Sequence, residues 1–260
     1  MHLKSCMRGA AALVFCGLMV ATSTQAQEIR VTITNLAPAD GGNLLTPFWV
    51  GFHNGDFDAY ETNMAATPGL ERLAEDGNTA PLSEEFVGSG AGAQDATLAS
   101  PDGPLAPGAQ ATMTFVLEDG AAANRFLSCV SMFIPSNDAF VGNDDPTAHP
   151  IFDADDNFIG VDFVIVGSEV RDAGTEVNDE VPGNTAALEQ SAPDTGETEG
   201  ETIMTHDGFA EGGNIISAIP NGDFTVAGFE VARIVVELVS DNPTAVASRA
   251  WGQVKTGFTE

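Results

Sequence analysis

The chain has 260 residues, and its 9 basic residues stand against 38 acidic ones, so the formal net charge at pH 7 is −29. A field of this sign repels nucleic acids and anionic lipid surfaces and attracts cations, which argues against a nucleic-acid-binding role. Proteins from salty environments show the same acidity without any specific site, so charge alone assigns no function.

The first 26 residues have the three-part pattern of a secretory signal peptide. Lys4 and Arg8 form a basic start, an uncharged apolar run follows over residues 10–20, and small and polar residues lead to Ala26, after which we expect cleavage. The apolar run is too short for a membrane-spanning helix, which needs about 20 residues. The sequence therefore predicts a secreted or periplasmic protein without a membrane span.

The mature chain is expected to form one domain over residues 27–240, followed by a polar tail over residues 241–260. A domain of this length can bury one sizeable core without disulfide bonds. Cys129 is the only cysteine after Ala26, and its apolar neighbours predict a buried thiol.

Strand signals dominate this domain, because runs of alternating or β-branched apolar residues recur between turns rich in Gly, Pro, Asn and Asp. We expect strands over residues 28–34, 48–52, 111–117, 126–134, 158–166 and 231–239. With no alternation of strands and long helices, the pattern predicts an all-β fold, an antiparallel β-sandwich.

Helical patterns are few and short. Residues 68–75 predict one helix, with Pro68 near its start and Gly77 as its stop signal, and residues 79–87 predict another. The acidic segment 185–202 predicts a long mobile loop without regular structure.

The clearest candidate site is the segment Asp172–Glu176, in which two carboxylates lie four residues apart around Gly174. Glycine and threonine disfavour a helix here, so we expect a tight loop that turns both acids toward one point. Asp138 follows the expected strand 126–134 and lies at its end. Converging carboxylates favour a cation, and calcium accepts such oxygen ligands. On spacing alone the signal is weak, and a solvated acidic loop is the favoured interpretation because such loops are common in so acidic a chain.

Two other patterns carry weaker signals. Asp153–Asn157 begins like a calcium-binding EF-hand loop, but Phe158 and Val164 stand where glycine and glutamate are required, so we expect a turn. The histidines of the mature chain lie in no known catalytic motif, and those in the turn-like segments at His53 and His206 are interpreted as surface residues.

Several segments together resemble the spondin N-terminal domain family over about residues 28–240. The most specific pair is Ser136–Gly142, which contains Asp138, followed about thirty residues later by the Asp-Ala-Gly-Thr-acid loop at 172–176. The other matching segments are 31–36, 45–47, 52–56, 70–81, 211–213 and 231–236.

The resemblance implies a C2-like β-sandwich whose calcium ion is held by Asp138, Asp172 and Glu176. Animal members of the family act in the extracellular matrix and in cell adhesion, and many bacterial members are stand-alone exported proteins. This chain departs from the family pattern at Arg171, where an aromatic residue is usual, and at Glu176, where animal members have aspartate. It also lacks the cysteines and the thrombospondin repeats of the animal proteins.

We therefore expect an exported calcium-binding module for adhesion or interaction, not an enzyme, with a protein or glycan partner outside the cytoplasm. One alternative is a secreted hydrolase that uses acidic residues with His53 or His206, which a cleft holding two carboxylates and a histidine would favour. The other is an acidic structural matrix protein without a specific site, which would show no saturable metal binding.

Overall fold

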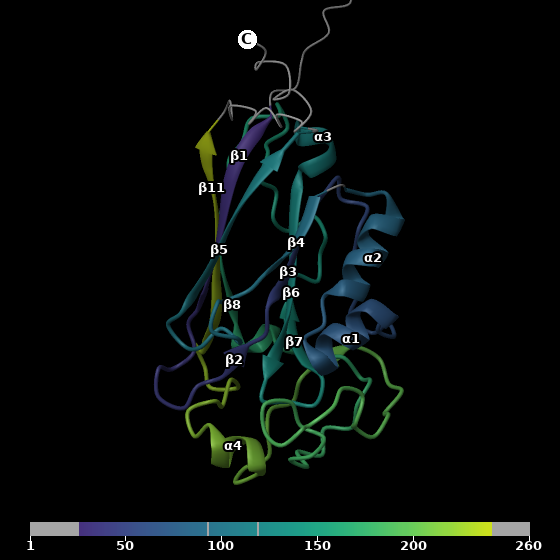
Figure 1. Ribbon diagram of the computed structural model, residues 1–260, viewed down its shortest axis with the longest axis vertical. Helices are drawn as coiled ribbons and strands as arrows, with labels where there is room; N and C mark the ends of the chain where they lie inside the picture. Colours follow the sequence, from purple (N-terminus) through teal and green to yellow (C-terminus); the bar gives the residue numbers. More distant parts are fainter. Residues whose placement is uncertain (1–25, 93, 119, 241–260) are drawn as a thin grey trace, which may run out of the picture.

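A computed structural model describes residues 26–92, 94–118 and 120–240, and it consists of two antiparallel β-sheets packed face to face (Figure 1). The four-stranded sheet has the order β5 (Gln110–Leu117), β1 (Gln27–Asn35), β11 (Glu230–Ser240), β8 (Val161–Val166). The second sheet has the order β10 (Met204–Thr205), β9 (Arg171–Asp172), β7 (Ala139–Gly142), β6 (Phe126–Ile134), β3 (Phe48–His53), β4 (Gln94–Leu98), and β2 (Leu44–Leu45) pairs with β6. The predicted all-β sandwich is confirmed.

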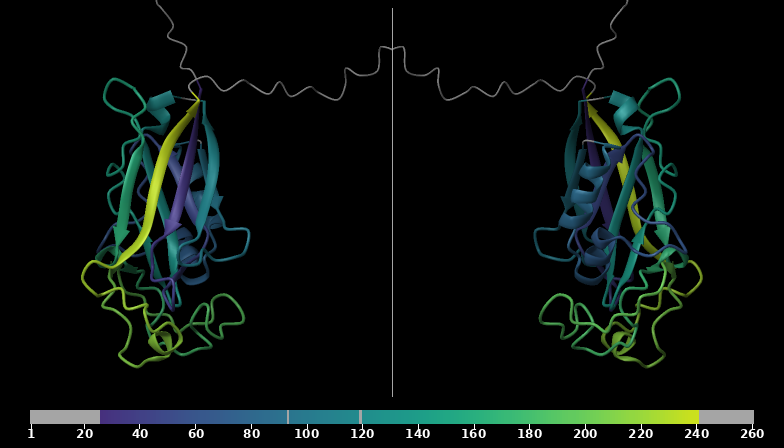
Figure 2. Two further views of the ribbon diagram at one scale, coloured as in Figure 1. Left: turned by 90° about the vertical axis from the view of Figure 1, so that its left-hand side faces the viewer. Right: turned by 90° about the vertical axis from the view of Figure 1, so that its right-hand side faces the viewer.

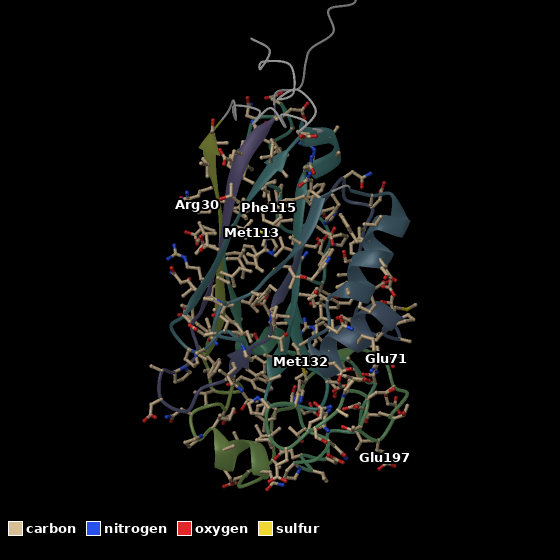
Figure 3. The ribbon with its side chains drawn as sticks, in the orientation of Figure 1. Arg30, Glu71, Met113, Phe115, Met132 and Glu197 are labelled. Atoms are coloured by element: carbon tan, nitrogen blue, oxygen red, sulfur yellow. The ribbon has the colours of Figure 1, made fainter. Side chains whose placement is uncertain are left out.

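The main core lies between the sheets because the strands alternate buried and exposed side chains. In β1, Ile29, Val31 and Ile33 are fully buried, whereas Arg30 between them is exposed. Figure 3 shows Arg30 on the outer side of the four-stranded sheet and Phe115 of β5 in the interior. This alternation is the same pattern that predicts the strand from sequence.

Two helices, α1 (Pro68–Asp76) and α2 (Ala80–Ser89), cover the outer face of the larger sheet, whereas the outer face of the four-stranded sheet carries no helix (Figure 2). The side chain of Thr67 accepts a hydrogen bond from the Leu70 N–H at the start of α1. At its end, Gly77 has a φ of 66°, a left-handed conformation that glycine adopts without strain. Shorter elements are α3 (Gly120–Asn124), α4 (Asn214–Ala218) and the 3₁₀ turn Gly167–Glu169.

A second apolar cluster joins these helices to the sheet. Trp49 of β3 is its largest member and packs against Phe57 and Phe86, with ring centroids 5.5 Å and 5.3 Å away. The indole Nε1–H donates to Asp95 Oδ2 over 2.9 Å. Leu70 and Leu73 of α1 and Phe86 of α2 belong to the same cluster, which holds both helices against the sheet.

The structure corrects one strand boundary. The strand expected over 158–166 begins at Val161, because Gly160 has a φ of 63° and Phe158 pairs across a turn with Phe152. That turn is Asp153–Asn157, as expected, and Asp153 Oδ1 accepts the N–H of Asn157 over 2.9 Å.

Cys129 is fully buried, and burial raises the pKa of its thiol to about 12. No helix in the described part of the chain is long and apolar enough to cross a membrane. The expected signal peptide, apart from Ala26, and the expected tail over 241–260 lie outside the described residues.

Candidate functional site

The loop after β9 wraps around one carboxylate, that of Asp138. This residue lies between β6 and β7 and is completely buried. Its Oδ2 accepts three hydrogen bonds, from Thr175 N–H at 2.8 Å, Thr175 Oγ1–H at 3.2 Å and Glu176 N–H at 3.0 Å. Gly174 has a φ of 68°, which permits the tight curl. The loop is as tight as expected, and Asp138 lies at its centre.

Asp172 lies beside this centre at the end of β9 and is only partly buried. Its Oδ1 accepts Gly174 N–H at 2.8 Å, and its Oδ2 accepts the side-chain amide of Asn178 at 2.7 Å. Burial and the nearby charge of Asp172 together raise the pKa of Asp138 above its usual range. The two carboxylates are therefore close enough to repel each other.

Glu176 completes the predicted set and is 3% exposed. Its Oε1 accepts Gly196 N–H at 2.9 Å. Burial, followed by the charge of Glu75, raises the pKa of Glu176 to about 7. Two buried oxygens of the set, Asp138 Oδ1 and Glu176 Oε2, have no hydrogen-bond partner among the described residues. A buried acceptor without a partner costs about 1–3 kcal/mol, and a bound cation, a water molecule or a proton would each offset that cost.

Glu75 of α1 is a further buried carboxylate that the sequence did not reveal as part of this site. It lines a cavity of about 210 Å³ together with Glu176 and Gly196, and burial raises its pKa to about 7. The charge of Arg72 partly offsets the effect of burial on the pKa of Glu75. Arg72 also pairs with Asp76 at 2.9 Å and with two other carboxylates. Negative charge thus remains in excess around the site.

The acidic segment 185–202 closes over these carboxylates from outside. It contains no helix or strand, as expected, but it is tied down at several points. Thr198 bridges to Glu176, Ala186 bridges to Ser136, and the Asp194 N–H donates to Asp76 Oδ1 at 3.3 Å. In Figure 1 the segment lies with the other loops below α1, and Figure 3 shows Glu197 at this end of the molecule.

The arrangement of these carboxylates determines how well they could hold a cation. Among the described residues, no group of three or more His, Cys, Asp or Glu side chains is arranged so that it could hold a metal ion. The physical reason is that Asp172 directs both oxygens to Gly174 and Asn178, while Asp138 Oδ2 holds the loop. The two oxygens without partners nevertheless have the donor chemistry of a calcium site, which also draws on backbone carbonyls and water. The oxygen atoms of the site are ligands of the kind that calcium prefers, but the described carboxylates do not form a complete coordination shell.

The interpretation of His53 and His206 as surface residues is wrong, because both are buried. Each imidazole Nδ1 accepts the N–H of the glycine two residues later, Gly55 at 3.1 Å and Gly208 at 3.0 Å. Those glycines have φ values of 106° and 107°, which glycine adopts without strain. The same His-x-Gly turn therefore occurs twice, and in each case the imidazole ring is hydrogen-bonded to the backbone of its own turn.

His53 provides a pH-dependent prediction. Its Nδ1 accepts a hydrogen bond, so the neutral ring donates from Nε2 to Ser128 Oγ at 2.9 Å, and burial lowers its pKa to about 4. A histidine whose pKa is lowered in the fold stabilises it fully above the unfolded pKa of about 6.5, and this stability is lost as the pH falls toward 4. We expect the stability difference between wild type and His53→Gln to shrink by about 3 kcal/mol between pH 7 and pH 4.

Urea unfolding at a series of pH values checks this expectation. Carboxylates with raised pKa values gain stability on acidification, but they are present in both proteins and cancel in the difference. A difference that stays constant across the range would show that His53 does not resist protonation.

Comparison with known protein families gives one match. The Spondin_N family model matches residues 43–164, which confirms the expected resemblance over this range. The matched range includes Asp138 and the two helices α1 and α2, and it ends eight residues before Asp172. No curated protein matches the chain at a significant level.

Proposed function

We propose that this chain, of which residues 43–164 match the Spondin_N family model, is an exported calcium-binding module that interacts with a protein or glycan outside the cytoplasm, and that it is not an enzyme. Asp138, Asp172 and Glu176 would hold the ion. Spondin domains are typical of extracellular interaction modules, which supports the coarser part of this proposal.

One observation carries the calcium assignment, namely the two unpartnered oxygens Asp138 Oδ1 and Glu176 Oε2 in the buried loop region. A divalent cation would satisfy both and would offset the mutual repulsion of the carboxylates. Asp172 can contribute because each carboxylate oxygen has a second lone pair beside the hydrogen bond it already accepts. The bound ion would tie the 172–176 loop to the β6–β7 connection and so order that end of the sandwich for a partner.

Thermal unfolding in excess EDTA and in millimolar calcium tests this proposal on residues 27–260. At a calcium concentration of about one hundred times the dissociation constant, a ligand of the native state alone adds about 2.7 kcal/mol. At about 2–4 °C per kcal/mol for a domain of this size, we expect the midpoint to rise by roughly 5–11 °C. Asp138→Asn and Glu176→Gln should lose most of this rise, since each removes a charge and an oxygen of the site.

The matched control is Asp102→Asn, which removes the same charge from an exposed loop. It should keep the full calcium response. An equal response in all variants would mean that calcium acts by screening bulk charge, and the absence of any response in the wild type would remove the calcium assignment.

The hydrolase alternative named His53 or His206, whereas the cavity that combines a histidine with carboxylates contains His149. A cavity of about 270 Å³ combines His149 with Asp144, Asp145 and Glu169, which is the combination that the alternative requires. His53 is enclosed by its hydrogen bonds, and the cavity that His206 lines has no acidic lining residue. The His149 ring stacks on Phe163 with centroids 3.5 Å apart.

A further inference from the structure

Strand β5 forms one side of the four-stranded sheet, and no described strand pairs with it on the side away from β1 (Figure 2). It has eight residues, and its register with β1 continues without a break from Gln110 to Leu117. None of these residues is charged and none is proline, although 18% of the chain is charged. Strand β5 is therefore a long, regular and uncharged sheet edge.

Every second residue of β5 directs its backbone N–H and C=O groups away from β1. The ladder between the two strands starts where the Asn35 N–H donates to the Ala109 carbonyl at 3.1 Å. Antiparallel strands exchange hydrogen bonds at every second residue, so Ala111 and the odd-numbered residues after it bond to β1. The residues whose backbone groups point outward are Gln110, Thr112, Thr114 and Val116. Within the described part of the chain, these outward groups form no hydrogen bond.

The other edge strands have features that discourage pairing with a further strand. Strand β8 has six residues, contains Asp162 and meets β11 with a register shift. Strand β4 has five residues and contains Asp95, and β10 has only two residues. Charges, bulges, prolines and short lengths are the usual means by which proteins protect a sheet edge. Strand β5 has none of them, so its edge can accept another strand.

A second copy of β5 matches this edge. When two β5 strands run antiparallel about a two-fold axis at Met113, Gln110 lies opposite Val116 and Thr112 lies opposite Thr114 of the other copy. All outward residues of both copies then exchange backbone hydrogen bonds, whereas a register shifted by two residues leaves some without a partner. The paired side chains carry no charge, and threonine pairs favourably across strands. We propose that the protein forms a two-fold homodimer in which β5 pairs with β5 of a second copy.

The charge distribution favours this edge as the meeting point of two copies. A chain with a net charge of −29 repels its copy, so the copies associate best where few like charges face each other. On the outer face beside β5, Arg30 pairs with Glu237 and Arg233 pairs with Asp162, so the charges there largely cancel. An edge contact buries less surface than a large apolar interface, and we expect a dissociation constant of about 10–100 μM.

Sedimentation equilibrium of residues 27–260 between about 5 and 500 μM tests the association. We expect a monomer–dimer equilibrium with the same dissociation constant in calcium and in EDTA, because the proposed calcium ligands lie outside β5. Raising NaCl from about 0.1 M to 1 M shortens the Debye length from about 10 Å to 3 Å and screens the repulsion between the copies. The association should therefore become at least about threefold tighter.

Amide hydrogen exchange, followed by NMR, identifies the edge that pairs. In the monomer, the amides of Thr112 and Thr114 point outward and should exchange fast, whereas those of Met113 and Phe115 are protected by β1. At about 500 μM protein, the exchange of the two threonine amides should slow at least about threefold, because most chains are then dimeric. The amides of Met113 and Phe115 should change little.

The decisive variant combines Thr112→Glu with Thr114→Glu, which places like charges opposite each other across the two-fold axis. Both side chains are exposed, so the core is unchanged. The dissociation constant should rise at least about tenfold. The matched control combines Thr32→Glu with Thr34→Glu, which adds the same charge to the same face one strand further from the edge. It should raise the dissociation constant less than about threefold, and the two variants should have similar unfolding midpoints.

Three results would overturn the proposal. The first is a protein that stays monomeric at about 500 μM in 1 M NaCl. The second is a dimer in which the Thr112 and Thr114 amides exchange as fast as in the monomer, because the copies would then meet elsewhere. The third is slow exchange of these amides at every concentration, which would mean that a segment of the same chain pairs with β5.

Discussion

Replacing Asp138 by alanine is expected to lower the free energy of unfolding by about 3 kcal/mol even without calcium. The substitution leaves the N–H groups of Thr175 and Glu176 and the Thr175 hydroxyl without the acceptor that now binds all three. Each buried donor without a partner costs about 1–3 kcal/mol, and removal of a buried carboxylate of raised pKa returns part of that cost. Denaturant unfolding in EDTA measures the difference.

Asp138→Asn separates the two roles of this side chain. The amide oxygen can still accept from Thr175 and Glu176, while the amide nitrogen takes the position of the unpartnered Oδ1. We expect this variant to be within about 1 kcal/mol of the wild type in EDTA, since the hydrogen bonds persist and the buried charge is gone. If Asn destabilised the apo protein as much as Ala, the Oδ2 hydrogen bonds would not be the cause.

Trp49→Ala is expected to cost about 3–5 kcal/mol, the range for removing a large buried aromatic side chain. Trp49 is fully buried, packs against Phe57 and Phe86, and donates to Asp95. Since it lies between the larger sheet and the helices, its loss should also loosen α1, which carries Glu75. Thermal unfolding measures the cost, and hydrogen exchange of the α1 amides measures the loosening.

Trp49→Phe is the matched control. It retains an aromatic ring in the cluster and loses only the indole hydrogen bond and part of the volume, so a cost of about 1–2 kcal/mol is expected. If α1 exchanged at the same rate in the wild type and in Trp49→Ala, the helix would be held by contacts other than this cluster.

The sequence by itself determined the strands and helices that bury one face. The strand at 126–134 and the helix that starts at Pro68 lie where the pattern places them, because alternation and capping signals depend only on neighbouring residues. It also indicated that Asp138 and the 172–176 loop belong to one site, through a family resemblance whose matched range includes Asp138.

Only the tertiary structure decided which distant groups meet. Glu75 and Gly196 lie near Glu176 because of how α1 packs and how the 185–202 segment runs. The residues that flank Glu75 and Gly196 in the sequence carry no signal that predicts this proximity. His53 is buried at the end of β3, where Ser128 of the neighbouring strand β6 accepts a hydrogen bond from its ring. Arg171 lines one cavity together with Gly142 of β7 and Val164 of β8, so strands of both sheets meet around it. Long-range contacts of this kind depend on topology, which a local pattern does not encode.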